Sequence, residues 1–277
     1  MSLRVTVVAT VVALGVVAGP ATAQQPVPTV TVNASPTAAT VGAAGPIPSG
    51  PTRLNFVRPA GVTKDISAYV ALLVPGVSLE QIQLTLASDD RSEGESTLGL
   101  ISIQASVAVA SGEAQRAVTF NVKPGLTYVV LVEQDTERGA PPRSFTTFSS
   151  SGAANGAVAP APAATVRMQG LRFKGPSSLK QTGTVRFENR DGVAHFALAF
   201  PLRKGTTTAQ LGKAVRGSQR AFGRIVAGAP YMAQSVISGG DTYNDQEVHF
   251  PKKGRYGLVC FIGQHERLGM YRLITVK

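Results

Sequence analysis

Three side chains that bind soft metals lie close together near the C-terminal end of the sequence. Cys260 is the single cysteine of the 277-residue chain, and His265 and Met270 follow it in the pattern Cys-x4-His-x4-Met. Apolar runs flank this segment, so we expect a strand, a short loop that carries the ligands, and a final strand. Closely spaced ligands on a loop can converge on one point, whereas an extended strand would separate them. The pattern therefore predicts a metal site built on one loop.

A fourth candidate ligand comes from a distant part of the chain. His195 follows the turn-forming segment 189–192, with the sequence Asn-Arg-Asp-Gly, and begins an apolar stretch. A thiolate, two imidazoles and a weak axial thioether make up the trigonal ligand set of redox-active copper. Zinc fits less well, because zinc sites favour four strong donors and gain little from a thioether. The four side chains thus predict a site for one copper ion.

Each of these residues taken alone has a simpler interpretation. An isolated cysteine most often packs as a small buried hydrophobic residue, and His195 or Met270 alone would fit an ordinary strand or core. The combination at this spacing, in a strand–loop–strand context, favours copper. A copper-free domain of the same fold is the remaining alternative.

The ligand spacing resembles that of the cupredoxins, the blue-copper domains of the plastocyanin and azurin type. The resemblance rests on Cys-x4-His-x4-Met after a Gly-x-Tyr strand at 254–256, with an upstream histidine after Asn-x-Asp-Gly. It covers residues 165–277 and does not extend to the N-terminal half. It implies a Greek-key β-sandwich with the copper at one end.

The same resemblance implies a role for each ligand. His195, Cys260 and His265 would be the strong equatorial ligands, and Met270 would be the weak axial one. In this family the second histidine lies nearest the surface and is the usual electron exit, a role that would fall to His265.

Two positions depart from the family pattern. Phe196 stands where the family often has an asparagine directly after the first histidine ligand, and 263–264 is Gly-Gln where the family often has Pro-Gly. Neither change removes a ligand. Both are expected to alter the redox potential through the residues around the ligands, while leaving the metal site in place.

The rest of the chain has to hold these segments in position, and its patterns are those of β-structure. Short alternating or apolar runs separated by glycine, proline and serine indicate two folded regions, residues 51–148 and 165–277. Residues 149–164 are expected to be a linker, and the uncharged residues 24–50 a disordered spacer. The predicted fold class is all-β: a C-terminal Greek-key cupredoxin-like β-sandwich with one inserted helix, preceded by a second β-sandwich-like domain of unknown role.

Individual strands are predicted from these runs. In the first region they fall at Ala68–Val74, Ile82–Leu86, Leu98–Ala110, Val118–Val122 and Thr127–Val132. In the second region they fall at Val185–Phe187, Phe196–Phe200, Tyr256–Ile262 and Tyr271–Val276.

One helix is expected inside the second region. Thr207 and Gln210 have the spacing of a capping box, and Leu211, Val215 and Phe222 would lie near one face. The glycines at 212 and 217 lower the helix propensity of this segment.

The N-terminal end has the pattern of a cleavable export signal. Arg4 precedes the apolar run Val5–Val17, which Gly19 and Pro20 interrupt before the small-residue pattern at 21–23. The run is too short for a membrane span, so we expect residues 1–23 to be a signal peptide cleaved after Ala23. The mature protein is expected to be secreted or periplasmic and not membrane-spanning.

Charge is divided unevenly between the two halves. Residues 24–164 contain 8 basic and 10 acidic side chains, net −2, whereas residues 165–277 contain 18 basic and 6 acidic ones, net +12. This excess favours an anionic partner, and we expect an acidic redox protein to dock near His265. Arg267, Arg272, Lys252 and Lys253 are the candidate basic rim. Nucleic acid is not expected, because no phosphate-binding loop or base-reading motif accompanies the charge.

The function predicted from these residues is electron transport. There is no HExxH metalloprotease motif or nucleophile elbow, and only His249 remains after the ligands are assigned, too few for the second copper centre of a copper oxidase or nitrite reductase. We expect an exported blue-copper electron carrier that binds one copper per chain and is not an enzyme. The alternatives are a copper-binding or storage protein outside the cytoplasm, and a copper-free surface-binding module.

Overall fold

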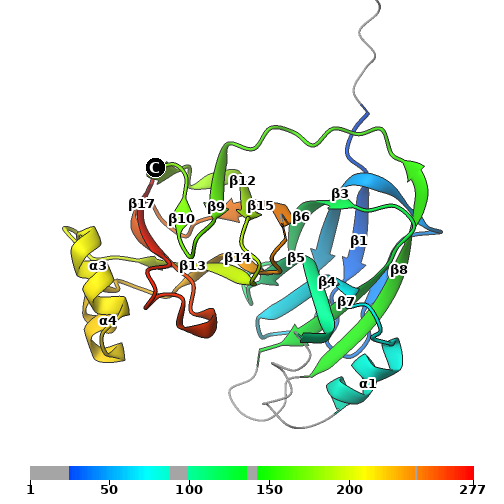
Figure 1. Ribbon diagram of the computed structural model, residues 1–277, viewed down its shortest axis with the longest axis horizontal. Coiled ribbons are helices and arrows are strands. Elements are labelled where there is room, and N and C mark those ends of the chain that lie inside the picture. The colour runs from blue at the N-terminus through cyan, green and yellow to red at the C-terminus, as the bar shows by residue number, and fades with distance from the viewer. Residues whose placement is uncertain (1–24, 88–98, 136–141, 241) are drawn as a thin grey trace, which may run out of the picture.

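The computed structural model describes residues 25–87, 99–135, 142–240 and 242–277. The predicted signal peptide, residues 1–23, lies outside this part of the chain. Strands dominate the described residues and pack as sandwiches in both halves, which confirms the all-β fold class. Figure 1 shows the two halves side by side. None of the described helices combines the length and apolarity needed to cross a membrane.

The C-terminal half consists of two facing sheets. The strands are β9 (Ala164–Met168), β10 (Phe173–Lys174), β11 (Ser178–Leu179), β12 (Thr182–Asn189), β13 (His195–Pro201), β14 (Tyr231–Ile237), β15 (Thr242–His249), β16 (Gly254–Val259) and β17 (Tyr271–Val276). One sheet has the order β10-β9-β12-β15 and the other β11-β17-β16-β13-β14. The chain crosses between the sheets after β10, β11, β12, β14 and β15, as in a Greek key. All four strands predicted here are present, but β16 ends at Val259, so residues 260–262 of the predicted strand Tyr256–Ile262 belong to the loop that follows.

Strand β13 places its small residues in the core. His195, Ala197 and Ala199 are fully buried between the two sheets, whereas the alternating residues Phe196 and Phe200 are half-buried, Phe196 against the margin of this core and Phe200 in the outer cluster. Successive side chains of a strand point to opposite faces, so this register is what turns His195 inward. The bulky residues that predict the strand from the sequence are therefore its half-buried ones, and the small residues fill the core.

The N-terminal half forms a second sandwich with its own core. Its strands are β1 (Thr29–Asn33), β2 (Thr40–Val41), β3 (Ile47–Val57), β4 (Ile66–Leu73), β5 (Ile101–Val109), β6 (Gln115–Val122), β7 (Thr127–Gln134) and β8 (Arg143–Ala154). Their inward side chains make one apolar cluster. Four of the five strands predicted in this region are confirmed, as β4, β5, β6 and β7.

The expected spacer and linker are both wrong over much of their length. In place of a disordered spacer at 24–50, residues 29–33 form β1, which pairs in parallel with β3 and buries Val30 and Val32. The short Thr-Val-Thr-Val alternation is the physical reason, since it gives one apolar face to a neighbouring strand. In the predicted linker 149–164, the first six residues continue β8.

A continuous sheet connects the two halves. Strand β15 pairs with β6 through Asp245↔Thr119 and Gln246↔Val118. Next to this pairing, the Gln246 side chain donates a hydrogen bond to the Ser106 carbonyl at 2.7 Å. The halves are thus joined by backbone pairing as well as by side-chain packing.

The strand predicted at Ile82–Leu86 is instead the helix α1 (Leu79–Ala87). Ser78 and Gln81 form a capping box, in which the Gln81 side chain accepts from Ser78 N–H at 2.7 Å and Ser78 Oγ accepts from Gln81 N–H at 3.2 Å. A capping box is typical of a helix start. It outweighs the alternation of apolar and polar residues at 82–86, which is compatible with a strand or a helix.

The single helix predicted after Thr207 is two helices, α3 (Thr208–Val215) and α4 (Gln219–Ile225). The capping box of Thr207 and Gln210 is present as expected, but α3 ends before Gly217 and Ser218 caps α4. Leu211 and Val215 pack with the outer faces of the neighbouring strands. Both helices lie at the edge of the molecule farthest from the N-terminal half (Figure 1).

The two helices allow a matched test of this packing. A methyl group added at Gly212 in α3 would lie 2.7 Å from Tyr271 Cζ, whereas one added at Gly223 in α4 would meet no atom within 4 Å. We expect Gly212→Ala to lower the free energy of unfolding by about 1 kcal/mol or more through overpacking. Gly223→Ala should raise it by about 0.5–1 kcal/mol through helix propensity. Urea denaturation of both variants would show opposite shifts, and shifts of the same sign would contradict this packing.

Candidate metal centre

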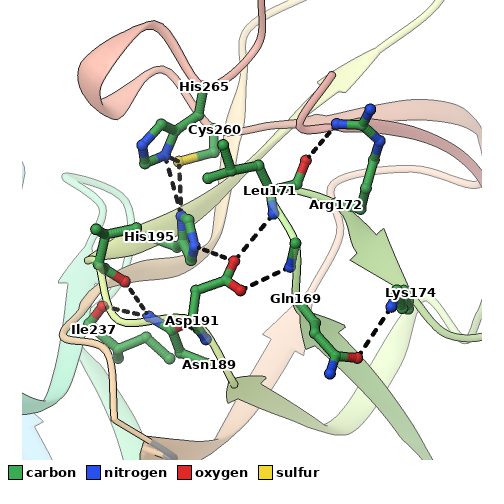
Figure 2. A network of polar contacts seen from close by, with 12 residues as sticks. Gln169, Leu171, Arg172, Lys174, Asn189, Asp191, His195, Ile237, Cys260 and His265 are labelled. Atoms are coloured by element: carbon green, nitrogen blue, oxygen red, sulfur yellow. Dashed lines mark hydrogen bonds and ion pairs between the residues drawn. The ribbon is translucent and has the colours of Figure 1, made fainter. Parts of the chain in front are cut away.

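His195 is placed by the turn between β12 and β13. Asn189, the last residue of β12, donates from Nδ2 to the carbonyls of Val193 at 2.8 Å and Ile237 at 3.2 Å. Its Oδ1 accepts from Asp191 N–H at 3.0 Å. These three hydrogen bonds fix the turn, so that Asp191 points back to the first residue of β13 (Figure 2).

The loop between β16 and β17 places the other candidate ligands. Cys260 N–H donates to the Met270 carbonyl at 3.1 Å, which closes the loop at its base. Inside it, Met270 N–H donates to the His265 carbonyl at 2.9 Å, and His265 N–H donates to Ile262 at 2.9 Å. The backbone thereby brings His265 back over Cys260.

A short 3-10 helix, η1 (Ile262–Gln264), makes this turn possible. Gly263 and Gln264 both have positive φ, 52° and 61°. Glycine adopts this left-handed conformation freely, but for glutamine it costs on the order of 1 kcal/mol. The strained residue directly precedes His265, at the position where the resembled family often has glycine.

The structure brings three of the four predicted ligands into one buried cluster. His195 Nδ1 lies 3.2 Å from His265 Nδ1, and Cys260 Sγ lies 3.9 Å and 3.7 Å from these two nitrogens. One ligand atom from each residue falls within 4.8 Å of the others. Figure 2 shows both imidazoles turned toward the sulfur. A thiol and two imidazole nitrogens facing one point are a donor set that fits copper.

Met270 and His249 have different surroundings. Met270 is fully buried in the core cluster that also contains Cys260. Its backbone is held next to the cluster, and its role as the axial ligand stays a prediction. His249, which was given no role, is exposed at the end of β15 and does not belong to the cluster.

Asp191 contacts the cluster, although the sequence alone did not predict it as a site residue. Its Oδ2 accepts from His195 Nε2 at 2.9 Å and from Leu171 N–H at 3.1 Å, and its Oδ1 accepts from Gly170 N–H at 2.7 Å. The carboxylate keeps the proton of His195 on Nε2, so Nδ1 presents a lone pair to the cluster. The sequence feature that could have predicted this contact is the spacing Asp-x3-His. When a turn precedes a strand, residues at this spacing can lie next to each other.

The turn that Asp191 holds belongs to the β9–β10 hairpin. Gly170 and Leu171 have φ of 63° and 52°, the pattern of a type I′ turn. Arg172, next in the chain, donates to the Leu268 carbonyl in the loop between β16 and β17. The hairpin therefore contacts both segments that carry candidate ligands.

Burial sets the protonation states of the cluster. Burial lowers the pKa of His195, and a hydrogen bond to Asp191 opposes this shift. Burial also lowers the pKa of His265, and burial raises the pKa of the Cys260 thiol. For Asp191, burial raises the pKa, but the N–H groups of Gly170 and Leu171 outweigh it and the net pKa is lowered. These shifts favour neutral imidazoles and a thiol in the metal-free cluster at neutral pH.

A buried carboxylate lies beside the cluster. Glu266 is 7% exposed, and its Oε2 has no hydrogen-bond partner among the described residues. Burial lowers the pKa of His265 and the negative charge of Glu266 opposes this shift, whereas for Cys260 the charge adds to the raising of the pKa by burial. Such a charge favours a cation at the cluster.

The predicted basic rim is only partly correct. Lys252 and Lys253 precede β16, whereas Cys260 follows its other end, so they lie about 20 Å away along the strand. Arg272 donates to the carbonyls of Phe173 and Gly175, which makes it a structural residue. Arg267, 59% exposed, is the one member of that rim located next to the cluster.

Comparisons with known proteins find structural neighbours only. No protein-family model and no curated protein matches the chain. Auracyanin B is 21% identical, with 43% of this chain and 93% of that chain covered and a TM-score of 0.27. Auracyanin A, a blue copper protein from Chloroflexus aurantiacus, is 22% identical over 41% and 96%, with a TM-score of 0.28. Copper nitrite reductase from Nitrosomonas europaea is 12% identical over 91% and 94%, with a TM-score of 0.25. Scores this low leave the function to be inferred from the site itself.

The protonation states predict how the stability of the metal-free protein depends on pH. The two histidines titrate near their ordinary pKa of 6.5 when unfolded and below it when folded, so the unfolded chain binds more protons below pH 6.5. The free energy of unfolding should be at its full value above pH 6.5 and fall as the pH drops. Above pH 9, the raised pKa of Cys260 should make it fall again.

Chemical denaturation of chelator-treated protein between pH 4.5 and 10 would measure this profile. The double variant His195→Gln, His265→Gln removes both imidazoles, and we expect a shallower decline below pH 6.5 than in the wild type. An equally steep decline in the double variant would show that other groups cause it.

Proposed function

We propose that the C-terminal half is a type 1 copper domain that carries single electrons. The observation that supports this most directly is the buried cluster of His195, Cys260 and His265, whose ligand atoms lie within 4.8 Å of one another. The cluster unites residues from two distant segments and holds two nitrogen donors and one sulfur donor. In this proposal Met270 is the weak axial ligand, and each chain binds one copper ion.

Copper bound there would supply a one-electron couple, Cu(I)/Cu(II). The residues of the chain contribute a fixed geometry. Asp191 orients the imidazole of His195, and the backbone N–H groups of Phe196 and Ile262 hydrogen-bond to the Cys260 sulfur, which lowers the pKa of the thiol against the effect of burial. Ligands held in this way move little between oxidation states, and a small reorganisation favours fast electron transfer.

An electron carrier fits this chain better than a copper enzyme. The described residues contain a single group of three clustered metal-binding side chains, and the remaining histidine, His249, is exposed. A second copper centre of the kind used by copper oxidases would need several more histidines than the three in the sequence. The proposal includes export through residues 1–23 and an acidic redox protein as partner.

Copper binding with a cysteine-to-serine variant tests the proposal. Titration of the purified protein with Cu(II) should give an intense visible thiolate-to-copper band that saturates at one copper per chain. Cys260→Ser should abolish the band, because the thiolate is its source. His249→Gln is the matched control and should leave the band unchanged. A protein that binds no copper would refute the proposal, and slow electron self-exchange in a copper-loaded protein would favour storage.

Asp191→Asn tests the role of the carboxylate. The amide keeps the shape of the side chain but removes its charge, so His195 loses its charged hydrogen-bond partner. We expect Cu(II) affinity to fall about 10–100-fold. The reduction potential should rise, because a nearby negative charge stabilises Cu(II) over Cu(I). Competition titration and voltammetry measure the two quantities, and an unchanged potential would contradict this role for Asp191.

A further inference from the structure

Helices α3 and α4, with the turn before α3, carry a concentrated positive charge. We call this surface the basic helical unit; its exposed members are Arg203, Lys204, Lys213, Arg216, Arg220 and Arg224. None of them forms an ion pair with a residue in the described part of the chain. The sequence has no acidic residue between Asp191 and Asp241. The charge of the unit is therefore not neutralised within its own segment.

The apolar faces of both helices are already used by the fold. Leu211 and Val215 of α3 pack in one cluster with Val259, and Phe222 and Ile225 of α4 pack against the same cluster. A helix that inserts into a membrane surface needs its apolar face free. The exposed faces offer cations and small polar residues instead, which suits an acidic protein surface better than a lipid layer.

Three aromatic rings connect the unit with the metal centre. Phe222 of α4 lies 4.8 Å from Phe200 of β13 and 6.1 Å from Phe261, measured between ring centroids. Phe261 directly follows Cys260 in the chain and is 38% exposed. Arg220 and Arg224 are four residues apart, so they share the exposed face of α4, opposite the face through which Phe222 packs on the sandwich. Helix α4, which carries Arg220 and Arg224, thus packs through Phe222 against Phe261, the one chain neighbour of Cys260 that reaches the surface, because Val259 is fully buried.

We infer that the basic helical unit and Phe261 together form the docking surface for an acidic one-electron carrier protein. The inference rests on the proposed function, since it assigns the electron route to the Cys260 side of the centre. In the exchange, one electron passes from the reduced partner to Cu(II) held by Cys260, which gives Cu(I) and the oxidised partner. No proton or atom is transferred. An apolar contact with a charged margin is the usual composition of such an interface.

The chain offers a matched control for this surface. Lys252 and Lys253 are exposed and lie at the opposite end of β16 from Cys260. Two double variants are compared: Arg220→Glu with Arg224→Glu, and Lys252→Glu with Lys253→Glu. Both change the net charge by the same amount, so any difference between them is due to where the charges lie on the surface. The neutral pair Arg220→Gln, Arg224→Gln covers the case in which reversed charges disturb α4.

The first measurement is docking. An acidic [2Fe–2S] ferredoxin serves as the probe and is titrated into isotope-labelled protein, both copper-free and Cu(I)-loaded. Its paramagnetic cluster should broaden the amide signals of α4 and of residues near Phe261. The broadening should be lost in the Arg220/Arg224 variants, retained in the Lys252/Lys253 variant, and weakened at high salt, because exposed charges are screened there.

The second measurement is electron transfer. Ferredoxin, reduced beforehand with no excess reductant, is mixed with Cu(II)-loaded protein in a stopped-flow instrument. At low salt we expect the second-order rate constant of the Arg220→Glu, Arg224→Glu variant to be roughly tenfold or more below that of the wild type. In the Lys252→Glu, Lys253→Glu variant, the logarithm of the rate constant should fall by less than half of the decrease expected for the arginine variant.

The outcomes separate this inference from the proposed function. Equal effects of the two charge-reversal pairs, or broadening centred elsewhere, would overturn the docking surface even if copper binds as proposed. A protein that binds no copper but shows the predicted broadening in its copper-free form would refute the electron-carrier function. The basic surface would then still be a binding site for an acidic protein. Binding to vesicles that contain phosphatidylglycerol, without binding to ferredoxin, would overturn a protein partner in favour of a membrane surface.

Discussion

The hydrogen bond between Asp191 and His195 Nε2 is the interaction on which the geometry of the candidate metal centre depends. A fully buried imidazole needs a partner for its N–H, and here the partner is a carboxylate that also accepts two backbone N–H groups from the β9–β10 turn. One side chain thereby joins the β12–β13 turn to the hairpin, and Arg172 joins the hairpin to the loop of Cys260 and His265. The three segments hold one another in place.

The parts of the fold that follow local patterns could be predicted from the sequence. Strands β12, β13, β16 and β17 are visible as alternating or apolar runs, and the Cys-x4-His spacing predicts two ligands on one loop whatever surrounds it. Helix α1 could not be predicted from alternation, because residues 79 and 82 are also spaced for one face of a helix. The capping residues Ser78 and Gln81 distinguish the helix from the strand, which the apolar positions alone do not.

The parts that depend on distant partners could not be predicted in the same way. Strand β1 is stable because β3 covers its edge, and the register of β15 against β6 depends on two segments more than 100 residues apart. The role of Asp191 has the same origin. Its spacing to His195 is visible in the sequence, but the turn at Gly170 that makes the carboxylate a three-way acceptor is not. Long-range pairing, more than local propensity, limits what such a sequence reveals.

The distribution of charge follows from the demands of a buried centre. Two carboxylates, Asp191 and Glu266, lie within or beside the cluster, where low solvent exposure strengthens their field. Under the proposed function, they would favour the more positive oxidation state of a bound metal without providing a ligand. The cations lie outside, on an insertion that packs on the sandwich but contributes no candidate ligand. Under the proposed function, the carboxylates near the centre would adjust the potential and the cations at the surface the choice of partner, and the two sets can change independently because they lie on separate segments.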